Sequence, residues 1–496
     1  MISPVGFCAG KSVVFIHDRL FCFMCALKPI VMKFGGTSVE DARAFARVAD
    51  IVASRTELRP VVVVSAMSRM TDALLASVRQ AVAGELQAAL ATLEPHFARH
   101  VIIASALSTG ERQGILAAIE SARAEIAGLL RLISEQSRPI LELTDAVLSY
   151  GEKLSSILLA AIMRQRGVAA RQVDARRCII TDQEHGCATP LLNETFECSC
   201  AELRPLIKQS LVPVLGGFVG ATANGETTTI GRGGSDYTAS LIGAALEAAE
   251  IQIWTDVNGV LTADPRLVPA ARTIPRLSYA EAAELAYFGA RVLHPKTIQP
   301  AVEGNIPVRI CNSRAPEDSG TLVCAESETT RHTVKAIAHK TGVTTVQISS
   351  ARMLGAYGFL RALFEVFDRH RTIVDVVTTS EVSVSLSLDD ASALPKVVEE
   401  LAQLGAVRVE KDRAIICVVG EGLRGTPGIA ARVFSTISDI NVTLISQGAS
   451  SINLTFAIEE ARVSEAVTRL HETFFSESNV QSPTSKVAAG ILGASA

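Results

Sequence analysis

The chain first becomes regular at Pro29-Ile-Val-Met-Lys33-Phe-Gly35-Gly36-Thr-Ser38, an apolar run that ends in two glycines. The run predicts a β-strand, and the glycines end it. A lysine at the end of a strand, followed by glycines that let backbone N–H groups approach an anion, is typical of a phosphate-binding loop. A tight turn with an exposed lysine is the alternative, so this motif needs support from elsewhere in the chain.

The segments that follow alternate between strands and helices. Helical spacing over residues 45–52 and an apolar run over residues 61–64 predict a β-loop-α-β start and a parallel sheet covered on both faces. Residues 72–150, rich in alanine and leucine, predict several helices that cap one side of this sheet. Further elements are expected as strands at residues 169–174, 212–217, 251–255 and 306–311, and as helices at residues 237–250 and from the capping box Ser278-Tyr-Ala-Glu281 to about Gly289.

The character of the sequence changes after about residue 335, where a unit of roughly 75 residues occurs twice. Each copy has the order strand, glycine-bearing loop, helix, strand. The first copy is expected at residues 343–348, 355–358, 359–370 and 372–377, and the second at residues 414–419, 420–428, 429–437 and 442–446. Residues 477–496 show no periodicity and are expected to form a mobile tail.

Length and composition exclude several classes of protein. A chain of 496 residues, 48% hydrophobic and 20% charged, is typical of a well-packed α/β protein of roughly two to four domains. Its net charge of −4 provides no basic surface for nucleic acid. No apolar run of roughly 18 residues occurs, so no membrane span is expected. The scattered cysteines predict free thiols and a cytoplasmic location.

The first 28 residues hold short apolar patches interrupted by His17, Asp18 and Arg19, and no small-residue cleavage site follows them. We therefore expect an N-terminal extension, with Met24 as an equally good start. A weak organellar transit peptide is the alternative.

A second glycine-rich motif, Gly231-Arg232-Gly-Gly-Ser235-Asp236, stands between an apolar strand and a helix. Its glycines remove side chains from a loop aimed at a helix N-terminus, whose dipole favours negative charge. Arg232 adds a planar fork suited to a carboxylate or phosphate, although a flexible surface loop is the alternative. Three further groups of polar residues are candidate ligand contacts at strand ends or at the start of a helix. Their alternative role is ordinary, as strand ends or N-caps. They are Thr255-Asp256-Val-Asn-Gly with Asp264-Pro-Arg266, Ser65 with Thr71, and Ser149-Tyr-Gly-Glu152.

Together these motifs resemble one family, the aspartate kinases, which belong to the amino-acid kinase superfamily and carry paired C-terminal ACT domains. The resemblance extends over roughly residues 30–475, and the glycine-arginine loop is its most specific part. The matching motifs are Val-Met-Lys33-Phe-Gly-Gly-Thr-Ser38, Ser149-Tyr-Gly-Glu152-Lys, Gly231-Arg-Gly-Gly-Ser-Asp236-Tyr-Thr-Ala, Thr255-Asp256-Val-Asn-Gly and Phe288-Gly-Ala-Arg-Val-Leu-His294-Pro295.

The resemblance implies an α/β fold: an amino-acid-kinase three-layer sandwich with a mainly parallel sheet, followed by two ferredoxin-like βαββαβ ACT domains. The implied bounds are residues 1–28 for the extension, 29–325 for the catalytic domain, 334–412 and 413–476 for the two ACT units, and 477–496 for the tail. The two ACT units could share strands.

The family reaction transfers the γ-phosphoryl group of ATP to the β-carboxylate of L-aspartate and yields 4-phospho-L-aspartate. The substrate carboxylate is itself the nucleophile and is ionised at neutral pH, so charge neutralisation and alignment are needed rather than a strong general base. The sequence shows no convincing nucleophile–base pair, in agreement with this reaction. The implied cofactors are ATP and Mg²⁺, which would bridge phosphate oxygens, and no protein metal ligand is assigned.

The resemblance also implies roles for single residues. The implied catalytic residues are Lys33, which would neutralise the transferring phosphoryl group, Asp236, which would orient the cationic side chains, and Arg232. The implied substrate-binding residues are Ser65, Thr71, Glu152 on the aspartate ammonium group, Arg232 on its α-carboxylate, and Ser235. The implied nucleotide-binding residues are Lys33, Gly35, Gly36, Thr255, Asp256, Leu261, Arg266 and Arg291. Two of these depart from the family pattern, since Arg291 stands where many relatives have lysine and Leu261 where an aromatic residue is common.

In this family the first ACT unit usually binds lysine, so feedback inhibition by lysine is expected. The implied effector-binding residues are Met353, Ala356, Phe359, Leu360, Val374, Asp375, Ser380 and Glu381. Gly355-Ala356-Tyr357 replaces a polar pattern of some bacterial lysine-sensitive members, and Ile373 replaces a serine. ACT pairing implies a homodimer or a dimer of dimers, and a purely structural interface is the alternative role for these units.

Two other functions are open at this point. One is another amino-acid kinase acting on glutamate, acetylglutamate or UMP, which the tandem ACT units and Glu152 disfavour. The other is a catalytically silent amino-acid sensor, which the presence of Lys33, Arg232 and Asp236 disfavours. A fused homoserine dehydrogenase is not expected, because only about 20 residues follow the second ACT unit.

Overall fold

The computed structural model describes residues 28–136, 138–289, 293–326, 333–355, 357–448 and 450–476. The chain divides into two compact units, Met1–Gln252 and Ile253–Ala496. The expected N-terminal extension, apart from Lys28, and the expected tail lie outside the described residues. All cysteines in the described part of the chain are free, as their scatter predicts.

The first unit is built on parallel strands in the order β3 (Ala170–Val173), β5 (Val212–Gly216), β2 (Pro60–Val64) and β1 (Ile30–Phe34). Each neighbouring pair is parallel. The four valines of β2 are fully buried, as the apolar run predicts for a strand covered on both faces. The register sets Lys33 beside Val63, and Val64 beside Gly216, so the carboxyl ends of three strands share one edge.

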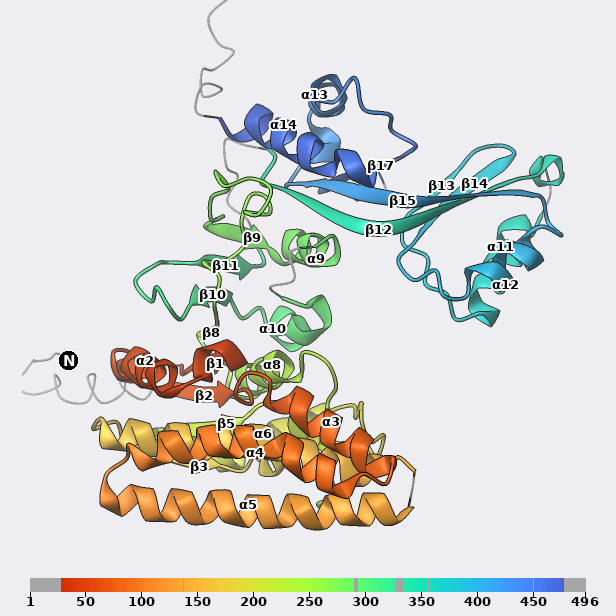
Figure 1. Ribbon diagram of the computed structural model, residues 1–496. Helices are drawn as coiled ribbons and strands as arrows, with labels where there is room; N and C mark the ends of the chain where they lie inside the picture. The colour runs from red at the N-terminus through yellow and green to blue at the C-terminus, as the bar shows by residue number, and fades with distance from the viewer. Residues whose placement is uncertain are drawn as a thin grey trace, which may run out of the picture. The chain divides into compact units, whose positions relative to one another are not determined.

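Helices surround these strands. Figure 1 shows α5 (Thr109–Gln136) on the far side of α4 (Leu86–Ser105) and α6 (Leu141–Gln165) from β1 and β2. Among the described helices, α6 alone has the length and hydropathy to cross a membrane, but 78% of its most apolar window is buried inside the unit, so it is a core helix. The helices of the unit are α2 (Ala42–Ala53), α3 (Met70–Val82), α4 (Leu86–Ser105), α5 (Thr109–Gln136), α6 (Leu141–Gln165), α7 (Leu192–Lys208) and α8 (Gly234–Leu246).

The segment around the glycine-arginine motif differs from the prediction in two ways. A small sheet of β4 (Ile180–Thr181), β6 (Val219–Thr222) and β7 (Thr227–Thr229) precedes the motif, and the sequence pattern did not predict it. The helix expected at residues 237–250 begins at Gly234 and ends at Leu246. Gly233 caps it with a φ of 76°, a conformation that glycine adopts readily, so the helix starts inside the motif.

The second unit opens with strands in the order β8 (Glu250–Thr255), β10 (Val308–Asn312), β11 (Thr321–Cys324) and β9 (Arg276–Ser278), of which β8 begins in the first unit. Helix α9 (Tyr279–Tyr287) begins with the predicted capping box, in which Ser278 and Glu281 exchange hydrogen bonds. Helix α10 (Gln299–Glu303) precedes β10.

The rest of the second unit is a six-stranded antiparallel sheet in the order β13-β14-β12-β15-β17-β16. Two long strands, β12 (Ala336–Ser349) and β15 (Ala406–Val419), run through the centre of this sheet and each serves two hydrophobic cores. The flanking elements are β13 (Val377–Thr379), β14 (Ser383–Leu388), β16 (Leu444–Gln447), β17 (Asn453–Glu459), α11 (Phe359–Arg369), α12 (Leu394–Leu401), α13 (Ile429–Thr436) and α14 (Val463–Phe475).

The first core uses the second half of β12, α11, β14, α12 and the first half of β15. Strand β13 pairs with β14 at the edge, which completes a βαββαβ order. The second core uses the other half of β15 and borrows Ile337 from the start of β12, so one strand comes from earlier in the chain. The expected α/β fold class, a mainly parallel sheet followed by ferredoxin-like units, is confirmed.

One predicted strand of the repeat is misplaced. The strand expected at residues 372–377 begins only at Val377. Before it, Asp375 donates its N–H to the carbonyl of Ser387, but Ile373 is 79% exposed and pairs with no strand. The β-branched residues that predict a strand here therefore lie in an extended loop at the edge of the sheet.

Candidate active site

Lys33 and Asp236 form an ion pair at the carboxyl ends of the parallel strands in the first unit. Lys33 lies near the end of β1, and Asp236 lies in the first turn of α8. Nζ of Lys33 lies 2.7 Å from Oδ1 of Asp236, and the two side chains are 12% and 18% exposed. The pair holds an ammonium group in place at the edge where α/β sheets bind ligands.

Glycines at the end of β5 let two other predicted residues approach this edge. A Cβ on Gly216 would lie 2.8 Å from the Cβ of Glu152, and one on Gly217 would lie 2.6 Å from the Cβ of Ser235. Neither distance leaves room for a side chain, so both glycines are required by packing. Gly216 and Gly217 were not predicted as site residues, although two glycines that end a buried strand are the signal that could have found them.

Glu152 is a buried carboxylate with an unused oxygen. It lies on α6 and is 4% exposed. Burial raises the pKa of Glu152 to about 7, while hydrogen bonds from the backbone N–H groups of Ala66 and of Glu152 itself, and the charge of Lys33, oppose that rise. Among the described residues Oε2 of Glu152 has no hydrogen-bond partner. A buried oxygen of this kind is suited to an ammonium group supplied by a ligand.

The loop after β1 combines extended and helical backbone. Gly35 is extended, and Gly36 opens the short 3₁₀ helix Gly36–Val39. Ser65 follows β2 and donates its N–H to the carbonyl of Phe34, and Thr71 lies in the first turn of α3. Both side chains are half-buried. The structure therefore brings the loops that carry these residues together beside Lys33.

Arg232 lies in the loop between β7 and α8. Its side chain is exposed and makes no hydrogen bond or ion pair within the described part of the chain. Asp145 on α6 supports the start of this loop, because its buried carboxylate accepts hydrogen bonds from the hydroxyl of Thr229 at 2.5 Å and from the N–H of Gly186 at 2.9 Å. Asp145 was not predicted; it precedes Glu152 by two helical turns and faces the same side of α6.

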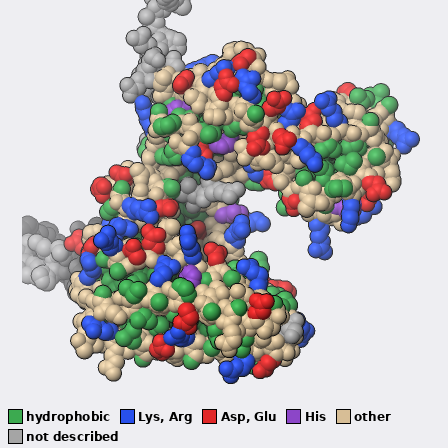
Figure 2. Space-filling model, viewed as in Figure 1, with side chains coloured by type: hydrophobic (Ala, Val, Ile, Leu, Met, Phe, Trp, Pro, Cys, Tyr) green, Lys and Arg blue, Asp and Glu red, His purple; other side chains and the backbone are tan. Residues whose placement is uncertain are grey.

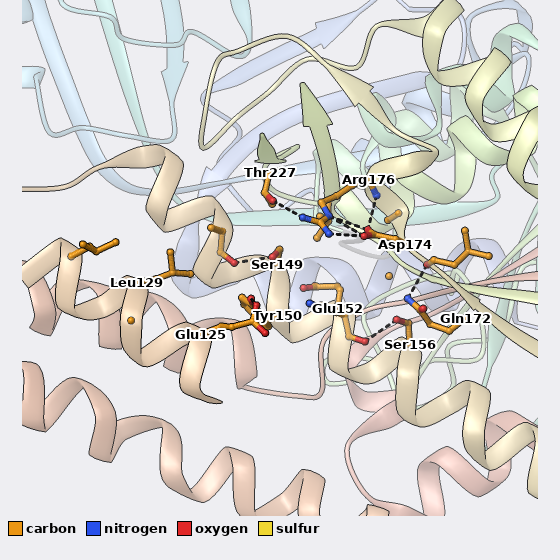
Figure 3. A pocket seen from close by; sticks show the side chains of 18 of the residues that line it. Glu125, Leu129, Ser149, Tyr150, Glu152, Ser156, Gln172, Asp174, Arg176 and Thr227 are labelled. Carbon is orange, nitrogen blue, oxygen red and sulfur yellow. Dashed lines mark hydrogen bonds and ion pairs between the residues drawn. The ribbon is translucent and has the colours of Figure 1, made fainter. Parts of the chain in front are cut away.

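A cavity of about 630 Å³ lies between α5, α6 and β3 (Figure 3). On one side of the cavity the Arg176 guanidinium donates hydrogen bonds to the carboxylate of Asp174. On another side the Tyr150 hydroxyl donates a hydrogen bond to Glu125. Among the predicted site residues, only Glu152 lines this cavity. The cavity therefore adjoins the candidate active site at Glu152 and Gly216, and it contains neither Lys33 nor Asp236.

The predicted nucleotide-binding residues of the second unit follow β8. Thr255 ends this strand, and its hydroxyl donates to Asp256 at 3.2 Å. Arg266 is exposed and forms an ion pair with Asp264 at 2.6 Å, while Leu261 is half-buried in a β-bridge with Thr273. Arg291 lies outside the described residues.

The predicted effector residues gather around α11 and β13 in the second unit. The 3₁₀ helix Ala351–Met353 ends in Met353, and α11 begins with Phe359 and Leu360. Val374 packs against the first core. Ser380 hydrogen-bonds Ser383 and lies with exposed Glu381 in the turn between β13 and β14. Ala356 lies outside the described residues.

Asp375 lies in a cluster of charged side chains with Lys340 and Asp389. Its side chain is 3% exposed, and its Oδ2 has no hydrogen-bond partner within the described chain. Burial, together with a hydrogen bond to Asp389 and the charge of that residue, raises the pKa of Asp375 to about 7. Lys340 lies 3.7 Å from Asp375, forms a close ion pair with Asp389, and stands 4.6 Å over the ring of Tyr287. Two carboxylates therefore share one ammonium group.

The sequence matches known families along most of its length. The amino acid kinase family matches residues 28–312, and the ACT domain matches residues 416–474. Lysine-sensitive aspartokinase 3 of Escherichia coli is 38% identical over 473 residues, which cover 90% of this chain and 99% of that protein. Aspartokinase 1, chloroplastic, of Arabidopsis thaliana is 39% identical over 459 residues, covering 90% of this chain and 80% of the relative.

Solved structures give the same result. The crystal structure of E. coli aspartokinase III with aspartate and ADP, in the R-state, has a TM-score of 0.76 and 37% identity, and covers 90% of this chain and all of that one. The T-state complex of the same enzyme with lysine and aspartate has a TM-score of 0.77 and 38% identity, with the same coverage. With the paired Lys33 and Asp236, the buried Glu152 and the antiparallel C-terminal sheet in place, the chain belongs to the aspartokinases of the amino acid kinase family.

Proposed function

We propose that this protein uses ATP to phosphorylate the β-carboxylate of L-aspartate, giving 4-phospho-L-aspartate, the first step of lysine, threonine and methionine biosynthesis. The observation that carries the proposal is the half-buried Lys33–Asp236 ion pair together with Glu152, a buried carboxylate with an unused oxygen. A cation for a phosphoryl group and an anion for an amino-acid ammonium group are the two charges that this reaction requires. The aspartate and ADP bound by the E. coli relative support the same substrates here.

In the proposed reaction the substrate supplies its own nucleophile. An oxygen of the aspartate β-carboxylate attacks the γ-phosphorus of ATP, the bond to the β,γ-bridging oxygen breaks, and ADP leaves with that electron pair. Lys33 offsets the negative charge of the transferring group, and Asp236 holds the Lys33 ammonium in place. Glu152 binds the substrate ammonium, and exposed Arg232 reaches its α-carboxylate. Ser65, Thr71 and Ser235 complete the aspartate pocket, and Gly35 and Gly36 present backbone N–H groups to the phosphates.

Mg²⁺ would reach the site with the nucleotide. This ion usually keeps several waters and binds phosphate oxygens with one or two carboxylates, so the protein need not provide a full set of ligands. The Asp236 carboxylate, which is paired with Lys33 and is 18% exposed, would be the protein ligand for such an ion. Mg²⁺ there would neutralise phosphate charge. Thr255, Asp256, Leu261, Arg266 and Arg291 are proposed for the nucleotide.

We further propose that lysine inhibits the enzyme by binding the first ACT unit. The open Oδ2 of buried Asp375 is the supporting observation, because an effector ammonium would satisfy it and would reduce the charge imbalance around Lys340. The E. coli relative that was crystallised with lysine supports lysine as a ligand of this kind of enzyme. The other proposed contacts are Met353, Ala356, Phe359, Leu360, Val374, Ser380 and Glu381.

A homodimer, alone or as half of a dimer of dimers, is proposed through the same ACT unit. Large apolar side chains are exposed on and around α11 and β13, where Figure 2 shows hydrophobic atoms at the surface. Exposed apolar patches of this kind mark interaction surfaces, and symmetric pairing is the commonest way to cover them. The exposed residues are Leu354, Tyr357, Leu360, Phe364, Ile373, Val377 and Val382. A cytoplasmic location stays a prediction.

The proposed function is tested by trapping acyl phosphate with hydroxylamine. The purified chain is incubated with ATP, Mg²⁺ and either aspartate, glutamate, acetylglutamate or no acceptor. We expect a hydroxamate signal with aspartate alone. A signal with another acceptor would assign the chain to a different amino acid kinase activity, and no signal from folded protein would favour an amino-acid sensor without turnover.

A further inference from the structure

Arg99 on α4 donates two hydrogen bonds into the loops that frame the Lys33–Asp236 pair. Its Nη1 lies 2.9 Å from the carbonyl oxygen of Ser68, and its Nη2 lies 2.6 Å from that of Glu40. The Arg99 side chain is half-buried. One planar group therefore spans the segment after β1 and the segment after β2.

The same two loops also bind each other through their backbones. The N–H of Ser68 donates to the carbonyl of Gly36 at 3.2 Å, and a Cβ on Gly36 would lie 3.5 Å from the Cα of Ser68. Ser68 is thus held on both sides, by Gly36 at its N–H and by Arg99 at its carbonyl. With Glu40 at the end of the 3₁₀ helix that Gly36 begins, these contacts close a ring around the loop that follows Lys33.

We propose that Arg99 is a positioning residue for phosphoryl transfer: its guanidinium sets the spacing between the glycine loop after Lys33 and the turn that opens α3 with Thr71. The proposal rests on the proposed kinase function. Both loop carbonyls are held by a single rigid fork, so the fork fixes their separation. A lysine would bring the same charge as a single point and could not hold both carbonyls in one geometry. Alignment of this kind matters because misplacing reacting groups by about 1 Å can cost about 100-fold in rate.

The test compares Arg99→Ala and Arg99→Lys with Arg112→Ala in the full-length protein. Arg112 is a matched control, because it also donates two hydrogen bonds to backbone, both to the carbonyl of Leu107 and none to these loops. For Arg99→Ala we expect kcat/KM for aspartate to fall about 100-fold, mostly in kcat. Arg99→Lys should recover only a small part of this loss, and Arg112→Ala should match wild type.

Hydrogen exchange of residues 35–40 and 65–71 provides a second readout that does not depend on turnover. Both segments should exchange faster in Arg99→Ala than in wild type and should be unchanged in Arg112→Ala. Folded Arg99→Ala protein with wild-type kinetics and exchange would overturn the proposal, as would full recovery of kcat by Arg99→Lys. If Arg99→Ala does not fold, Arg99→Lys decides the matter by the same readouts. Inactive wild-type protein would contradict the kinase function, while the exchange data would still test the role of Arg99.

Discussion

Glu152 in the first unit and Asp375 in the second are chemically alike and differ in their surroundings. Both carboxylates are almost fully buried, both have one oxygen without a hydrogen-bond partner in the described chain, and both have a pKa raised to about 7. For Glu152, burial alone raises the pKa, and the nearby charge of Lys33 lowers it. For Asp375, the like charge of Asp389 adds to the effect of burial.

We relate this difference to the two proposed roles, a preorganised catalytic site at Glu152 and an effector site at Asp375 that responds to its ligand. The positive charge of Lys33 and the negative charge of Asp236 cancel, so the net charge beside Glu152 does not depend on a ligand. Around Asp375, Lys340 faces two carboxylates, so an additional ammonium group restores neutrality. A balanced pair suits a site that must be preorganised for chemistry, whereas an unbalanced cluster suits one that must respond to a ligand.

Lys33→Ala should have the largest effect, because it removes the cation of the proposed catalytic site. We expect kcat to fall by about 10³-fold or more, since no other charge replaces the ammonium group at the transferring phosphoryl group. Hydroxamate formation measures the loss, and circular dichroism should show an intact fold. Lys28→Ala is the control, because it also removes a lysine that faces a carboxylate. Lys28 is exposed, and its contact with exposed Glu247 is long, at 3.9 Å. Wild-type turnover in Lys33→Ala would remove Lys33 from the mechanism.

Glu152→Gln should raise the KM for aspartate by about 10–100-fold, because a neutral amide replaces a charged partner of the substrate ammonium. The pH dependence sharpens this prediction. In wild type the KM for aspartate should rise as pH falls below about 7, since Glu152 then becomes protonated before substrate binds. In Glu152→Gln the KM should be flat between pH 6 and 8. An unchanged KM, or the same pH dependence in both proteins, would exclude Glu152 from ammonium binding.

Asp389→Asn should change regulation more than catalysis. It removes the like charge beside Asp375, so the pKa of Asp375 should fall. The pH at which lysine inhibition weakens on acidification should then move downward, by roughly one unit. Asp390→Asn is the matched control, because Asp390 is the next residue, is exposed, and accepts hydrogen bonds from the backbone N–H and the side chain of Ser392. Dose–response curves for lysine at several pH values distinguish the two variants, and equal shifts in both would argue against the Asp375–Asp389 pair.

The smallest expected effect is on stability. The pKa of Glu152 is higher in the folded chain, about 7, than its ordinary value of 4.5, so the folded state binds more protons across this interval. Glu152 therefore favours folding below about pH 4.5, and this contribution is lost as pH rises towards 7. Glu152→Gln should accordingly raise the melting temperature by a few degrees at pH 8, relative to wild type, and by less at pH 5. Thermal denaturation measures both increases. A larger increase in melting temperature at pH 5 than at pH 8 would contradict the buried ionised state of Glu152.

The two sites also show what sequence reasoning could reach. The Lys33 and Arg232 motifs were visible because glycines and charges at strand ends form local patterns. Helix α8 started three residues early, because Gly233 adopts a left-handed conformation that pattern reasoning assigned to the loop. Arg99 and Asp145 were not predicted, since each acts through contacts to segments far away in the chain and follows no local motif. Asp389 was missed for the same reason, because its role depends on pairing β14 with the loop that carries Asp375.

The most direct test of this account is calorimetric titration of lysine into the full-length protein at pH 7 in two buffers of different ionisation enthalpy. If lysine binds the partly protonated Asp375 carboxylate, its ammonium will displace a fraction of a proton per site, and the measured binding heat will differ between buffers in the direction of proton release. Absence of lysine binding, or a binding heat that is the same in both buffers, would contradict the assignment of the buried carboxylate as the effector site.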